Sequence, residues 1–274
     1  MNETVAARVT TGQRIFFAAV AALALWVGFW GYFAPPQVNK AIPWLVPPLH
    51  ARFLGAMYLS GAAFMIGCIV ATRWAQVRAV VSMAYIWTGM LFIVSLFHVE
   101  EFDFTKIQVW IWFGAYLIYP LIALWLSWTH SDQTRRKETT DSTLPSWTRG
   151  YLLIQGYVVT LLALALLLAP GFMTNLWPWK ITRLLAQIYS APFLAYGLGC
   201  LWFAHERSWS EIRVGVTATL VFAAGVLLAS YMHRNLFSAA DIADWLWFIG
   251  FAVATVMFGM LTIGAFRSLK SGEA

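Results

Sequence analysis

Long runs of apolar residues alternate with short polar segments along the whole chain. Eight of these runs contain no Asp, Glu, Lys or Arg: Ile15–Ala34, Phe53–Thr72, Ala79–Phe97, Ile107–Trp128, Tyr151–Ala169, Leu184–Ala204, Val214–Met232 and Trp245–Phe266. A helix of about 20 apolar residues crosses the hydrocarbon core of a bilayer and satisfies its own backbone hydrogen bonds. No run shows the alternating polarity of a transmembrane β-strand. The pattern predicts an all-α integral membrane protein with eight transmembrane helices.

Composition agrees with this prediction. Hydrophobic residues make up 61% of the 274 residues and charged residues only 11%, which is too little polar surface for a water-soluble globule of this size. The first run is longer than the 7–15 apolar residues of a secretory signal, so we expect it to remain as a membrane helix.

The basic residues are distributed unequally between the two sides of the predicted membrane. Of the 18 Lys and Arg residues, 12 fall on the side of the termini and 6 on the other side. Short loops rich in these cations stay in the cytoplasm, so we expect both termini to be cytoplasmic and the protein to lie in the cell membrane. The net charge of +6 then reflects topology and attraction to anionic headgroups, and nucleic-acid binding is not needed to explain it.

The second half of the chain resembles the first at an offset of 135 residues. The matches include Ala34-Pro35 with Ala169-Pro170, Pro43-Trp44 with Pro178-Trp179, Arg78 with Arg213, His98 with His233, and Trp110-x-Trp112 with Trp245-x-Trp247. We therefore expect a first four-helix repeat in residues 1–128, a cytoplasmic linker in 129–149 and a second repeat in 150–274. Because each repeat has an even number of spans, the two repeats are parallel, with a pseudo-twofold axis along the membrane normal.

Four polar residues at matching positions form the candidate site. Arg52 and Arg183 begin the second and sixth spans, and His98 and His233 end the third and seventh, all on the side away from the termini. Two guanidinium and two imidazole groups at one depth predict a cleft for an anionic headgroup, carboxylate or phosphate. In the alternative interpretation, each arginine reaches lipid headgroups by itself and each histidine caps its helix.

Aromatic residues are abundant, and many tryptophans fall at the predicted membrane interfaces. Such indoles anchor helices at the depth of the headgroups, and we expect this role for most of the following residues: Trp44, Trp74, Trp128, Trp147, Trp177, Trp179 and Trp209. Trp110 and Trp245 match between the halves and are candidates to border the apolar tail of a bound ligand. Cys68 and Cys200 lie within spans and are expected to act as small apolar residues, and Gln155 and Gln187 are expected to bond between helices.

Other interpretations of the histidines remain open. His98 and His233 could be axial haem ligands, and the acidic residues Glu100, Glu101 and Asp103 allow a divalent metal, although the second half has no matching acids. These acids could equally form a solvated loop with Lys106. His50 has no matching histidine in the second half.

The leading functional hypothesis is a membrane protein that binds or transports an amphipathic or lipophilic anion, with no cofactor. The sequence lacks phosphate-binding glycine loops, zinc motifs and nucleophile elbows, and no ionisable residue lies near the middle of a span, where coupled carriers usually place one. The alternatives are an intramembrane haem, metal or lipid-modifying enzyme and a structural subunit of a membrane complex. Expected partners are membrane lipids, a small amphipathic ligand, and a protein partner or second copy of the chain.

Overall fold

A computed structural model describes residues 8–38, 42–43, 46–130 and 144–271. Within these residues, eight helices are long and apolar enough to cross a membrane: α1 (Thr11–Phe33), α3 (Pro48–Val70), α4 (Arg78–Phe97), α5 (Ile107–Thr129), α6 (Ser146–Leu168), α8 (Arg183–Phe203), α9 (Trp209–Met232) and α10 (Ile242–Ser271). The prediction of eight transmembrane helices is confirmed, and the chain is a multi-pass membrane protein.

The helices extend beyond the charge-free runs that predicted them. The side chain of Thr10 caps α1 by accepting from the backbone N–H of Gln13. In turn, Oε1 of Gln13 accepts from the backbone N–H of Thr10 at 2.8 Å. Arg14 lies in the first turn of α1, and its Nη2 donates to the carbonyl of Ala71 at 2.8 Å. Helical geometry continues through the interfacial region, where such side chains can satisfy free carbonyls, so a run without charges marks only the central part of each helix.

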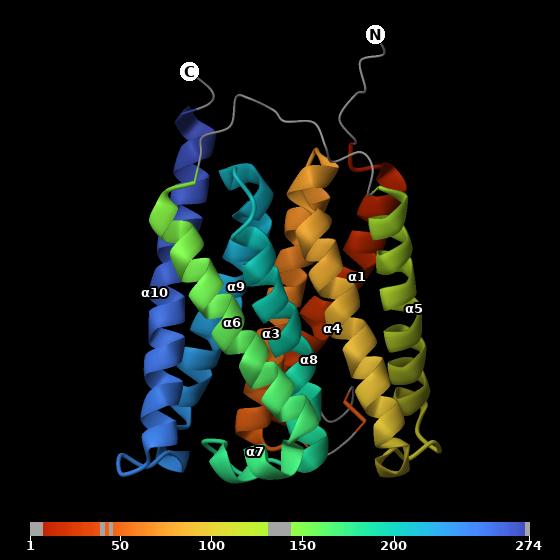
Figure 1. The fold of residues 1–274 in the computed structure, drawn as a ribbon. Helices are drawn as coiled ribbons and strands as arrows, with labels where there is room; N and C mark the ends of the chain where they lie inside the picture. The colour runs from red at the N-terminus through yellow and green to blue at the C-terminus, as the bar shows by residue number, and fades with distance from the viewer. Residues whose placement is uncertain (1–7, 39–41, 44–45, 131–143, 272–274) are drawn as a thin grey trace.

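The long helices run up and down through the molecule (Figure 1). The start of α1 and the end of α10 lie at one end, here called the terminal end, and the turns after α1, α4, α6 and α9 lie at the far end. Among the described residues, the far end carries four short helices: α2 (Pro35–Val38), α7 (Pro170–Leu176), η2 (Val99–Glu101) and η4 (Arg234–Leu236). The terminal end carries η1 (Trp74–Gln76).

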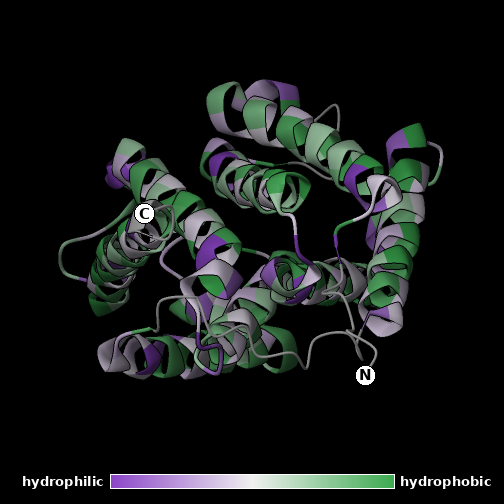
Figure 2. Ribbon diagram, turned by 90° about the horizontal axis from the view of Figure 1, so that it is seen from above, coloured by the Kyte–Doolittle hydropathy of each residue, from purple (hydrophilic) through white to green (hydrophobic). Residues whose placement is uncertain are grey.

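The two halves of the chain meet through four central helices. α3 packs against α1 and α9, while α8 packs against α6 and α4. α5 packs on α4 and α10 packs on α9, at opposite edges of the molecule (Figure 1). Seen along the helices, the ribbon is coloured mostly as hydrophobic (Figure 2), as expected where apolar side chains face lipid.

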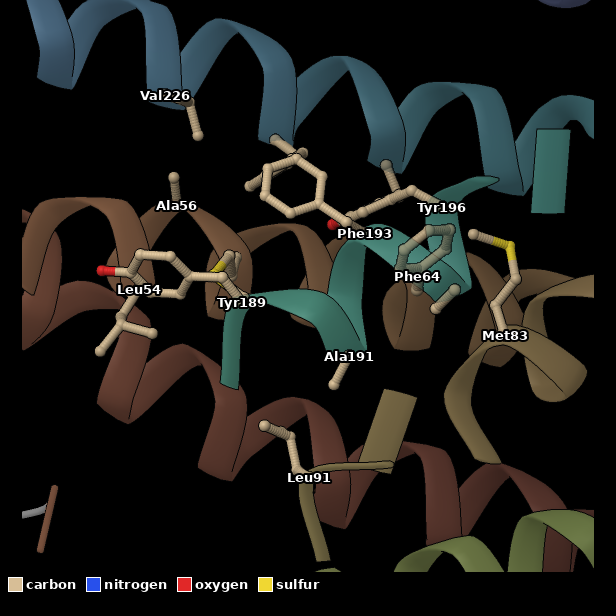
Figure 3. Packing of buried hydrophobic residues seen from close by; sticks show 14 of the residues in the cluster. Leu54, Ala56, Phe64, Met83, Leu91, Tyr189, Ala191, Phe193, Tyr196 and Val226 are labelled. Atoms are coloured by element: carbon tan, nitrogen blue, oxygen red, sulfur yellow. The ribbon is translucent and has the colours of Figure 1, made fainter. Parts of the chain in front are cut away.

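Large aromatic and aliphatic side chains fill the space between the central helices. Tyr189, Phe193 and Tyr196 of α8 point into this region, with Leu54, Ala56 and Phe64 of α3 nearby (Figure 3). The rings of Tyr196 and Phe222 are stacked, with centroids 4.6 Å apart. One polar side chain in the core joins the two halves: Ser60 Oγ donates to the carbonyl of Ala218 at 2.6 Å and accepts from the Tyr196 hydroxyl at 2.7 Å.

The expected interfacial role is wrong for four of the tryptophans. Four of them are only between 2% and 8% exposed: Trp74, Trp177, Trp179 and Trp209. The rings of Trp177 and Trp179, for example, are packed inside the protein and contact each other, with centroids 5.4 Å apart. Because a loop at the membrane surface can fold inward, position along the chain does not decide whether an indole faces lipid or protein. Trp128 and Trp147 are exposed, and Trp44 lies outside the described residues, as does most of the predicted linker.

Candidate functional site

The candidate site lies at the far end, where α3 meets the end of α9. Arg52 projects from α3, and its Nη1 lies 2.6 Å from Nε2 of His233, the residue that follows α9. A guanidinium group remains protonated and has only donors, so Nε2 of His233 accepts this hydrogen bond. The imidazole is therefore neutral, with its proton on Nδ1.

The guanidinium group of Arg52 is partly buried and has no acidic partner in the part of the chain that the structure describes. Its Nε is buried without a hydrogen-bond partner. The ion pairs found among the described residues do not include Arg52. Burial of the imidazole, and secondly the positive charge of Arg52, lower the pKa of His233 below its usual 6.5. The pair thus carries one positive charge and offers unused donors to an anion.

This geometry predicts a pH dependence of stability. Because the pKa of His233 is lower in the folded protein than in the unfolded chain, the unfolded chain binds the proton first, and the contribution of this group is complete only above about pH 6.5. We expect wild-type stability to decrease as the pH falls below that value, since a protonated imidazole cannot accept from Arg52. Thermal unfolding in detergent at a series of pH values measures the effect, and His233→Gln should show a shallower decrease. Parallel profiles for the two proteins would contradict the assignment.

The other two candidate residues, His98 and Arg183, are arranged differently. His98 follows α4, and its Nε2 donates to Oε1 of Gln187 on α8 at 2.5 Å, while Nε2 of Gln187 donates to the carbonyl of Leu167 on α6 at 2.8 Å. The interhelical role expected for Gln187 is confirmed. Arg183 is the first residue of α8, is exposed, and lies beside Gly171 of α7. The structure therefore pairs Arg52 with His233, but does not pair Arg183 with His98.

Trp110 and Trp245 lie apart from these polar contacts. They are 60% and 55% exposed, on α5 and α10 at opposite edges of the molecule (Figure 1). Each indole N–H donates to a carbonyl of the preceding loop: Trp110 to Phe104 at 3.0 Å and Trp245 to Ala239 at 2.9 Å. Both rings are therefore exposed on the outer surface of the helix bundle, one at each edge.

Sequence reasoning gave little weight to His50, which is buried close to the far end. Its Nδ1 lies 2.7 Å from the Tyr189 hydroxyl, and its Nε2 lies 3.2 Å from the carbonyl of Lys180. Since a carbonyl only accepts, Nε2 carries the proton and Nδ1 accepts from Tyr189. The contact joins α3 to α8 and to the loop before α8. The sequence comparison could not have found it, because His50 has no matching histidine in the second half.

The acidic residues near His98 form a solvated loop, as one interpretation predicted. Glu100 and Glu101 are exposed, and Asp103 pairs with Lys106 at 3.3 Å. Hydrogen bonds from Thr105, and then the nearby Lys106, lower the pKa of Asp103. Within the described part of the chain, no three His, Cys, Asp or Glu side chains come together as a metal site.

No family model, curated protein or solved structure matches this chain.

Proposed function

We propose that the protein binds or transports an amphipathic or lipophilic anion at its far end. The observation that carries this proposal is the partly buried guanidinium group of Arg52, which is held by a neutral imidazole and has no carboxylate partner among the described residues. An uncompensated cation at this depth is costly unless an anion or water reaches it. A carboxylate or phosphate headgroup would take the unused N–H donors, while the attached tail remains among apolar side chains.

The remaining candidate residues have different roles in this proposal. Arg183 is an exposed second cation that attracts the headgroup, and His98 stabilises the contact between α4, α8 and α6 through Gln187. Trp110 and Trp245 border lipid or ligand tails at the two edges. With the far end outside the cell and both termini in the cytoplasm of a cell-membrane protein, as the excess of basic residues favours, the ligand enters from the outer leaflet.

We also infer that the two halves are parallel repeats related by a pseudo-twofold axis along the membrane normal. Two kinds of matched contact support this inference. Trp112 Nε1 donates to Ser95 Oγ at 2.9 Å, and Trp247 Nε1 donates to Ser230 Oγ at the same distance. The contact of α3 with α9 also has its counterpart in the contact of α8 with α4. In this arrangement the axis relates α3 to α8, so Arg52 and Arg183 lie on equivalent helices at the same membrane depth.

Retention of an anionic lipid tests the proposed function. Wild-type protein in nanodiscs of zwitterionic lipid receives a small amount of phosphatidylglycerol, and native mass spectrometry counts the anionic lipid that remains bound. We expect Arg52→Gln to weaken retention about tenfold, which corresponds to the loss of a charge-assisted hydrogen-bonding group. Arg183→Gln should have a smaller effect, because this side chain is exposed and strongly solvated.

Arg234→Gln is the matched control. Arg234 follows His233 directly, but it is exposed, with its guanidinium 5.2 Å from the centre of the Tyr231 ring. This variant loses the same charge at the same end of the molecule and should retain the lipid as the wild type does. Equal retention by Arg52→Gln and Arg234→Gln, with both proteins folded, would overturn the proposal.

A further inference from the structure

The contact between Arg52 and His233 fixes the protonation state of the imidazole. Nη1 of Arg52 lies 2.6 Å from Nε2 of His233, and a guanidinium group can only donate. A proton on Nε2 would place two N–H donors and two positive charges against each other. Without an anion, the contact therefore holds the imidazole neutral. Burial of the ring, and secondly the charge of Arg52, lower the pKa of His233 below 6.5.

The acidic side chains at the start of α10 bind backbone groups rather than this pair. Oδ2 of Asp244 and Oδ1 of Asp241 each accept from a backbone N–H, at 2.5 Å and 3.0 Å. Neither carboxylate forms an ion pair in the part of the chain that the structure describes. The positive charge of Arg52 is therefore left for an anion from outside the protein to neutralise.

The other titratable groups packed around the pair are bound elsewhere. The guanidinium group of Arg234 lies 5.2 Å from the centre of its neighbouring tyrosine ring on α9. On α1, the Tyr32 hydroxyl donates to a backbone carbonyl of α9 at 2.8 Å, and on α3 both ring nitrogens of His50 have partners in the second half. Histidine is the side chain that changes charge near neutral pH, and His233 is the histidine in contact with Arg52.

An anion beside Arg52 reverses the balance that keeps this imidazole neutral. A carboxylate or phosphate accepts from the guanidinium group and brings a negative charge close to the ring of His233. A nearby opposite charge favours the protonated form of histidine. Nε2 then donates to the anion instead of accepting from Arg52. The occupied site thus favours one more proton than the empty site.

We propose that the Arg52 site takes up one proton, on His233, together with each anion that it binds. The proton is bound at the site of the proposed function, on which this inference rests. It comes from the solvent at the far end and returns there when the anion leaves. Because linkage between two ligands is reciprocal, anion and proton strengthen each other's binding by the same factor. A fall in pH on that side therefore favours loading of the site, and a rise favours release.

Isothermal titration calorimetry on the full chain in nanodiscs of zwitterionic lipid tests the proposal. The probe is dihexanoyl phosphatidylglycerol, whose phosphodiester keeps its single negative charge throughout the range in which histidine titrates. The titration is run at about pH 6.5, the ordinary pKa of histidine, in PIPES and in imidazole, two buffers with different ionisation enthalpies. We expect different binding heats in the two buffers, because the proton that the site takes up is released by the buffer.

The outcomes of this titration separate the inference from the proposed function. Saturable binding with equal heats in the two buffers would mean that no proton is taken up, which overturns the inference and leaves the proposed function standing. Binding no stronger than that of dihexanoyl phosphatidylcholine, a zwitterionic lipid with the same chains, would overturn both.

A pH series on two histidine variants assigns the proton. For the wild type, we expect the affinity for phosphatidylglycerol to rise about tenfold between about pH 8 and about pH 5.5, a coupling of ordinary size. His233→Gln keeps an acceptor for Arg52 but takes up no proton, so its affinity should be equal at the two pH values. His205→Gln is the matched control, because this histidine is exposed and lies at the terminal end, and it should retain the response of the wild type. Full pH dependence in His233→Gln would contradict the assignment.

The protonation of His233 can also be followed in the wild type, without any variant. Deuterium exchange at C2 of the imidazole, measured by mass spectrometry of peptides over a range of pH, gives the pKa of each histidine. With phosphatidylglycerol bound, the pKa of His233 should rise, whereas that of His205 should not change. An unchanged pKa of His233 at saturating lipid would show that the anion binds without a proton, contrary to the proposal.

Discussion

Replacement of Arg78 by Gln is expected to destabilise the folded protein by about 3 kcal/mol. Arg78 begins α4, and its Nη2 lies 2.6 Å and 2.5 Å from the two carboxylate oxygens of Glu206, three residues after the end of α8. The Glu206 side chain is 7% exposed, and it also accepts from the indole N–H of Trp202 at 2.8 Å. Removal of the guanidinium would leave a buried carboxylate without its cation, which is the costly way to break an ion pair.

A double-mutant cycle separates this cost from the loss of packing. Unfolding in mixed micelles of a nonionic detergent with increasing dodecyl sulfate, followed by circular dichroism, gives the free energy of each variant. We expect Arg78→Gln together with Glu206→Gln to be more stable than Arg78→Gln alone, because the second change removes the stranded charge. Arg149→Gln is the matched control at the same end, since its side chain is exposed. The expectation would be contradicted if Arg78→Gln lowered the free energy of unfolding no more than Arg149→Gln does.

Sequence alone could predict the spans, because the signal for a span is local. A run of about 20 residues without charge is sufficient to identify a membrane helix, and all eight runs lie within or almost within observed helices. The contact between Arg78 and Glu206 could not be predicted in the same way. Its residues are 128 positions apart, and their meeting depends on how α4 and α8 are rotated about their axes, which an almost uniformly apolar helix does not specify.

For the candidate site too, the sequence predicted the membrane depth of the side chains but not all of their hydrogen-bond partners. The ends of the spans placed Arg52 and His233 at one membrane depth, and the structure brings these two side chains into contact. The matching register of Arg183 and His98 did not predict that Gln187 would bond to His98 instead.

Replacement of Gly55 by Ala is expected to cost about 3 kcal/mol, although it adds only one methyl group. Gly55 lies where α3 crosses α1, and a Cβ at this position would lie 2.5 Å from the backbone nitrogen of Tyr32 and 2.8 Å from the carbonyl carbon of Gly31. Backbone atoms cannot move aside as the end of a flexible side chain can, so the two helices must separate. Close approach of small residues is a principal source of helix association in lipid, where apolar burial provides little driving force.

Gly114→Ala on α5 is the control for this prediction, because no atom lies within 4 Å of its Cβ. Alanine favours a helix over glycine by about 1 kcal/mol in water, so this variant should be as stable as the wild type or slightly more stable under the same unfolding conditions. The separation of α1 from α3 in Gly55→Ala should also weaken the hydrogen bond from the Tyr32 hydroxyl to the carbonyl of Gly225, now 2.8 Å long, which joins the first half to the second. If both alanine variants unfold at the same detergent composition as the wild type, the close crossing of α1 and α3 does not contribute to stability in the way proposed.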